Sequence, residues 1–150
     1  MDSNSLELGT FYNNIGLVYH SIEKYDEAFR YFNKAKILQE NYLDSNNIIL
    51  AITYNNIAMI YEENKNYEKA LIYFIKARNI QEQFGNSIDL ATICANIGNV
   101  YEIIGIYDES ILNLNRALNI LEKKLDKDDY SYIQIIKEKI EEVKHKMKEK

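Results

Sequence analysis

Apolar residues recur three or four positions apart along most of this chain, which is the spacing of one face of an α-helix. Leu8, Phe11, Ile15 and Val18 follow this rule in the first such stretch. The second stretch contains Ala28, Phe32, Ala35 and Leu38. A short polar segment separates the two stretches, so the pattern predicts two amphipathic helices joined as an antiparallel hairpin.

This block occurs three times. Tyr19, Tyr61 and Tyr101 mark equivalent positions, 42 and 40 residues apart, and the spacings within each copy are unchanged. Small residues recur where the two helices of a hairpin must approach closely, because a large side chain there would force them apart. They are Gly16, Ala58 and Gly98 on the first helices and Ala28, Ala70 and Ser110 on the second. The repetition predicts three hairpins of the same construction.

The ends of the expected helices carry suitable polar residues. Acidic residues such as Asp26 and Glu27 begin the second helix of each pair, near the positive end of the helix dipole. Candidate N-caps precede the first helices of the second and third copies. They are Asp44, Ser45, Asn86 and Ser87.

The repeated residues resemble the tetratricopeptide repeat family, which places an aromatic, a branched aliphatic, a Gly or Ala and a Tyr on the first helix, then Ala, Phe and Ala on the second. The resemblance covers about residues 6–121. Repeats of 40 to 42 residues are longer than the usual 34, as in kinesin light chains and the polarity adaptors related to them. Cys94 replaces the first aromatic in the third copy, and the proline often found near the end of the second helix is absent.

The resemblance implies an all-α fold, a right-handed superhelical solenoid of antiparallel helix pairs that forms one domain over residues 1–150. The repeats are expected at about 6–42, 48–84 and 88–124. A last apolar stripe predicts a further helix at about 129–148. Its members are Ile133, Ile136, Ile140, Val143 and Met147. Because its other face is charged, this helix is expected to cap the open apolar end of the stack.

The same stripe alternates by three and four like a coiled-coil seam, so a dimer through the last helix is an alternative to the expected monomer. It covers about two heptads, fewer than a stable coiled coil needs.

In this family the first helices line a concave wall that binds other proteins. The resemblance therefore implies a peptide-binding face made of Asn13, Asn14, Leu17, Asn55, Asn56, Met59, Glu62, Asn96, Asn99 and Glu102. Asn14, Asn56 and Asn96 share one repeat position, and their amides could pair with the backbone of any extended peptide. A purely structural role for these asparagines is the alternative. The carboxylates would favour lysine or arginine in the ligand.

Composition limits the other possibilities. A net charge of −5, with dispersed Lys and Arg, argues against nucleic-acid binding. No apolar run approaches the ~20 residues that cross a bilayer, so no membrane association is expected. The single cysteine, Cys94, fits a reducing, cytoplasmic compartment. The lysines and arginine with which some tetratricopeptide repeats grip a carboxylate terminus are replaced here by Asn13, Leu17, Thr92 and Asn96.

Catalysis finds no support in the sequence. His20 and His145 lie far apart, and no motif has the spacing of a metal site, a phosphate-binding loop or an activated nucleophile. The chain is therefore expected to be no enzyme and to need no cofactor. We expect a scaffold or adaptor that binds a peptide segment of a partner protein. The alternatives are a peptide-sensing regulatory domain that controls an associated enzyme and a structural unit that stacks into oligomers.

Overall fold

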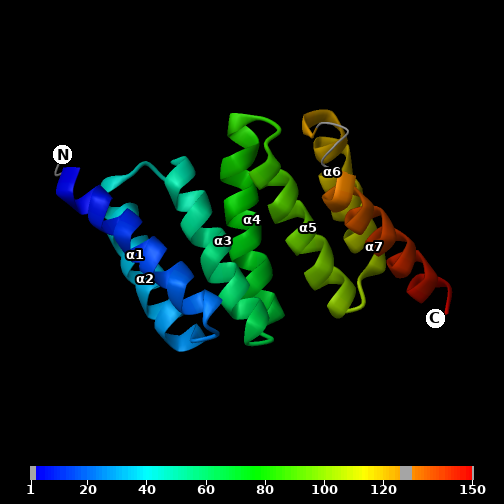
Figure 1. Ribbon diagram of the computed structural model, residues 1–150, viewed down its shortest axis with the longest axis horizontal. Helices are drawn as coiled ribbons and strands as arrows, with labels where there is room; N and C mark the ends of the chain where they lie inside the picture. Colours follow the sequence, from blue (N-terminus) through cyan, green and yellow to red (C-terminus); the bar gives the residue numbers. More distant parts are fainter. Residues whose placement is uncertain (1–2, 126–129, 150) are drawn as a thin grey trace. The chain divides into compact units, whose positions relative to one another are not determined.

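The computed structural model describes residues 3–125 and 130–149, with side chains for residues 7–125 and 131–149. The described residues form seven α-helices and one short 3-10 helix, and no strand (Figure 1). The elements are α1 (Ser3–Ser21), α2 (Tyr25–Tyr42), α3 (Ile48–Glu63), α4 (Tyr67–Gln81), η1 (Glu82–Phe84), α5 (Ile88–Ile103), α6 (Tyr107–Lys124) and α7 (Tyr130–Lys148). The predicted all-α repeat fold is confirmed.

The chain divides into two compact units. The first, Met1–Ile80, contains α1, α2, α3 and nearly all of α4, and the second, Gln81–Lys150, contains α5, α6 and α7. The expectation of one domain stays a prediction. The predicted start of the last helix at residue 129 lies outside the described residues.

Each hairpin turns at a residue in the left-handed backbone conformation. Its φ is 60° at Glu23, 57° at Lys65 and 81° at Gly105. In the second hairpin the N–H of Asn66 donates to the carbonyl of Tyr61 at 2.8 Å, and the equivalent bond closes the other two turns. This Schellman arrangement satisfies carbonyls that the helix end leaves free. The tyrosines that mark the repeat therefore also mark the last turn of each first helix.

Ser87 is the only one of the four candidate N-caps that the structure places in that role. Its Oγ accepts a hydrogen bond at 3.0 Å from the N–H three residues later. Asn47, not Asp44 or Ser45, caps α3, and its Oδ1 accepts from the N–H of Ile49 at 3.0 Å. The N–H of Asn47 itself donates to the carbonyl of Asp44, so a turn comes before the helix begins.

The small residues of the first helices allow close packing against the second. A Cβ at Gly16 would lie 2.5 Å from Cε1 of Phe32, and a Cβ at Gly98 would lie 2.8 Å from Cγ of Leu114. Phe32 and Leu114 are fully buried. The close approach expected from the sequence is confirmed at both glycines, where even a methyl group would require the facing side chain or its helix to shift.

Aromatic rings fill the space between helices in the first unit. The rings of Phe29 on α2 and Tyr61 on α3 meet edge to face, with centroids 5.3 Å apart. Tyr61 also stacks on Tyr73 of α4, with centroids 5.6 Å apart. The repeated tyrosines therefore pack helices together, as their periodicity predicts.

The apolar face of α1 is exposed, although the sequence pattern marks it as core. Phe11 and Val18 are 62% and 61% exposed, whereas their repeat equivalents on α3, Thr53 and Ile60, are almost fully buried. The difference arises because α2 packs against α3, and no described helix covers the corresponding face of α1.

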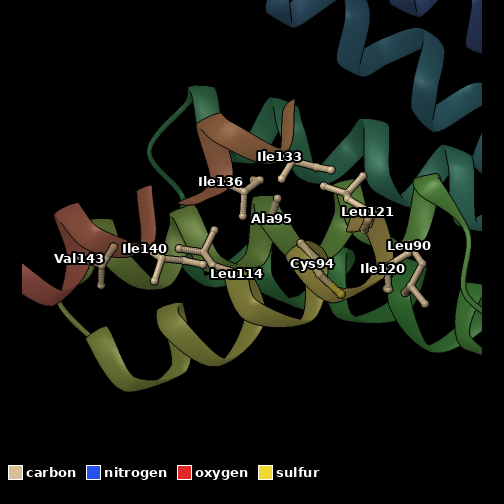
Figure 2. Packing of buried hydrophobic residues seen from close by; sticks show 12 residues of the cluster. Leu90, Cys94, Ala95, Leu114, Ile120, Leu121, Ile133, Ile136, Ile140 and Val143 are labelled. Atoms are coloured by element: carbon tan, nitrogen blue, oxygen red, sulfur yellow. The ribbon is translucent and has the colours of Figure 1, made fainter. Parts of the chain in front are cut away.

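Helix α7 supplies part of the hydrophobic core of the second unit. Figure 2 shows its side chains Ile133, Ile136, Ile140 and Val143 facing the apolar residues of α5 and α6. All four are at most 4% exposed. One face of α7 therefore completes the core of this unit, while its other face carries the charged residues.

The hairpin turns generate a test. We expect Lys65→Gly to raise the free energy of unfolding by about 0.5–1 kcal/mol, because glycine adopts the left-handed conformation without steric cost. Gly105→Ala should lower it by about 1 kcal/mol for the opposite reason. Urea unfolding followed by circular dichroism measures both changes. A loss of stability in both variants would show that backbone conformation does not limit these turns.

Candidate functional site

Three buried polar side chains form a series of hydrogen bonds that connects α1, α3 and α2. Asn13 on α1 donates from Nδ2 to Oγ1 of Thr53 on α3 at 2.5 Å, and Thr53 donates to Oε1 of Gln39 on α2 at 2.5 Å. All three residues are at most 6% exposed. Asn13, predicted to contact a ligand, is thus engaged in packing within the unit.

The three asparagines at the shared repeat position lie in different surroundings. Asn14 is exposed, Asn56 is only 6% exposed, and Asn96 is half-buried. Asn14 borders a shallow depression of about 240 Å³ lined also by Glu7, Thr10 and Phe11. Identical sequence positions therefore do not give equal access to a ligand, and binding by all three stays a prediction.

Three residues of the predicted peptide-binding face, Asn55, Met59 and Glu62, lie along α3 at intervals of four and three residues. Asn55 donates from Nδ2 to Sδ of Met59 at 3.6 Å. Because a thioether only accepts hydrogen bonds, this contact directs the amide nitrogen toward Met59 and leaves Oδ1 as the free acceptor. Oδ1 of Asn55 is buried and has no hydrogen-bond partner in the described part of the chain. Asn55, Met59 and Glu62 are all half-buried.

Glu62 ends this series with an unusual carboxyl group. Its burial, and then the charge of the adjacent Glu63, raise the pKa of Glu62 to about 7. Glu63 instead hydrogen-bonds to Tyr25, whose pKa is raised by burial first and by Glu63 next. Burial therefore favours the protonated form of Glu62 more than it is favoured at an exposed glutamate.

Glu102, the predicted contact at the same repeat position, is bound by lysines of α7. Its side chain is 5% exposed, and its two oxygens each lie 2.7 Å from an ammonium group, one of Lys139 and one of Lys146. Hydrogen bonds to Glu102 and Glu142 raise the pKa of Lys146, and the same partners raise that of Lys139 against the opposing effect of burial. Glu102 therefore fastens α7 to α5.

The remaining predicted residues are accessible in part. Leu17 on α1 is 42% exposed, and Asn99 on α5 is half-buried. The sequence reasoning missed the roles of Thr53, Lys139 and Lys146. Thr53 could have been noticed as a polar residue at a position where the first copy has Phe11, and the two lysines by their seven-residue spacing along one helix face.

The described residues include no group of three or more His, Cys, Asp or Glu side chains that could hold a metal ion. Cys94 is buried in the apolar cluster of its unit. Among the helices described, none is long and apolar enough to span a membrane.

Comparison with known proteins agrees with this architecture. The family model described as tetratricopeptide repeat matches residues 7–83 and again residues 49–123. No curated protein matches the sequence.

Solved structures share the fold at low sequence identity. BtubC from P. vanneervenii is 17% identical, with 94% of this chain covered and a TM-score of 0.76. The apo form of RapI is 21% identical, with 99% covered and a TM-score of 0.85. A Podosopora anserina kinesin light chain with nearly identical repeats is 15% identical, with 95% covered and a TM-score of 0.81. The chain spans 65%, 52% and 67% of these three structures respectively.

The Glu62 carboxyl group generates a second test. Its pKa is about 7 in the folded chain against an ordinary 4.5, so the wild-type protein should lose stability as pH rises through this interval. We expect Glu62→Gln to raise the free energy of unfolding at pH 8 by about 1 kcal/mol, after allowance for solvent screening. Near pH 4 the two proteins should be equally stable. Urea unfolding at both pH values measures the difference.

Glu102→Gln provides the matched control. It removes a carboxylate that two lysines bind, so it should lower the free energy of unfolding at pH 8 by about 1–3 kcal/mol. Stabilisation by both substitutions would contradict the contrast between the two sites. So would a gain for Glu62→Gln that persists at pH 4.

Proposed function

Because the chain belongs to the tetratricopeptide repeat family, whose members are generally protein–protein interaction scaffolds, we propose that it binds a peptide segment of a partner protein. The binding surface we propose is the face of the first helices, formed in the amino-terminal unit by α1 and α3. Its accessible members there are Asn14, Leu17, Asn55, Met59 and Glu62.

The chemistry of this face supports the proposal. Leu17 and Met59 offer apolar contacts, whereas the amide of Asn14 can both donate to and accept from a peptide backbone. The single observation that carries most weight is the buried Oδ1 of Asn55, which lacks a hydrogen-bond partner among the described residues. Buried polar atoms in folded proteins are nearly always hydrogen-bonded, so a ligand N–H that reached this atom after rotation of the half-buried Asn55 side chain would supply the missing donor.

In the second unit we propose that Asn96 and Asn99 on α5, which are half-buried, contact the peptide in the same way. Asn13, Asn56 and Glu102 are buried, so they are not part of the accessible surface that we propose. A regulatory domain that senses a peptide for an associated enzyme would use the same surface, so one experiment tests the binding step of both functions.

The experiment compares two exposed apolar residues in the same unit. A randomised peptide display library is first selected against the wild-type protein, and the affinities of the recovered peptides are measured for Leu17→Asp and Ile37→Asp. Leu17 lies on the proposed face, whereas Ile37, 56% exposed, lies on α2. We expect Leu17→Asp to weaken binding at least about tenfold, because it places a charge in an apolar contact, and Ile37→Asp to change it less than about twofold.

Circular dichroism verifies that both variants fold. Equal losses for the two variants would place the binding surface elsewhere. Failure to recover any peptide would contradict a peptide-binding function.

A further inference from the structure

Two glutamates occupy one repeat position. Glu62 follows Tyr61 directly, as Glu102 follows Tyr101, and each lies in the last turn of the first helix of its hairpin. The backbone turns that follow them are closed by the same hydrogen bonds. The local frame that holds the two carboxylates is therefore the same.

At Glu102 the carboxylate at this repeat position is paired with cations of the same chain. Lys139 and Lys146 bring an ammonium group to each carboxylate oxygen at 2.7 Å, and the glutamate side chain remains only 5% exposed. The cost of removing a carboxylate from water is offset only when cations and hydrogen bonds replace the lost hydration. Here two lysines from one helix supply that replacement.

At Glu62 no cation of the described residues pairs with the carboxylate. The described residues provide this carboxylate with neither an ion pair nor a hydrogen bond, and the charge of Glu63 acts on it repulsively. Two helical turns earlier on the same face, about 10 Å along the axis, the buried Oδ1 of Asn55 is a second acceptor without a donor. Between them Met59 offers a polarizable thioether, which can pack on the methylene stem of a long side chain. The face of α3 therefore presents a half-buried carboxylate and an apolar contact, and the described residues supply no cation for that carboxylate.

We propose that Glu62 binds one lysine or arginine side chain of the partner segment, whose cationic group pairs with the carboxylate as Lys139 and Lys146 pair with Glu102. Lysine and arginine each combine a cationic group that only donates hydrogen bonds with an apolar stem, which matches this combination of groups. This proposal rests on the proposed function, since it names the ligand chemistry of one part of the same surface.

The test selects the randomised peptide library separately against the wild-type protein, Glu62→Gln and Glu68→Gln. Glu68 is exposed on α4, so its substitution removes the same charge from the same unit without touching the α3 face. We expect peptides recovered by the wild type and by Glu68→Gln to share a lysine or arginine at one recurrent position. Peptides recovered by Glu62→Gln should lack that preference.

A double-mutant cycle then measures the interaction energy between Glu62 and the basic residue of the peptide. The affinity of one recovered peptide, and of its variant with glutamine at the basic position, is measured for the wild type and for Glu62→Gln. We expect Glu62→Gln to weaken the basic peptide about tenfold, as befits a half-buried ion pair, and to leave the glutamine peptide within about twofold.

The outcomes separate the two proposals. Recovered peptides without a recurrent basic residue, a basic preference that survives in Glu62→Gln, or equal losses for both peptides would overturn the assignment of Glu62 while peptide binding itself stands. If no protein recovers any peptide, the proposed function fails, and the assignment of Glu62 fails with it.

Discussion

The close approach of the two helices in each hairpin is the contact on which the rest of the structure depends. At Gly16 and Gly98 the backbone of the first helix lies directly against Phe32 and Leu114 of the second, with no room for a methyl group. This contact commits one side of α1 and one side of α5 to the second helix of the same hairpin. Only the remaining sides can meet the next hairpin or a ligand, so the interaction that buries the core also determines which side chains are presented.

Much of this arrangement could be predicted from the sequence, because it is repeated and local. Helical periodicity, the marker Tyr61 and its equivalents, and the small residues opposite Phe32 each depend on neighbours three or four positions away or on the same position in the next copy. The hairpin turns also fall where expected, although only Gly105 among the three left-handed residues belongs to the type that favours this conformation.

The parts that could not be predicted depend on what lies beyond a residue's own helix. Phe11 and its equivalent Thr53 have the same place in the repeat, yet one is exposed and the other buried, because α2 packs against α3 and no described helix covers that face of α1. The same limit applies to the proposed site. Asn14 and Asn56 are equivalent in sequence and opposite in exposure, and periodicity indicates which face is apolar without indicating whether anything covers it.

The two glutamates show how one repeat position can serve folding in one copy and remain available in another. Lys139 and Lys146 lie 37 and 44 residues beyond Glu102 in the sequence, so nothing in its own repeat indicates that its charge is neutralised. Glu62 has the same local frame without those lysines, and burial raises its pKa, so its charged form should cost stability at high pH. Such a cost is tolerated more readily where a ligand removes it, since binding then recovers the free energy that folding leaves unrealised. On this argument a structural residue and a recognition residue differ in their partners, and their position in the repeat does not distinguish them.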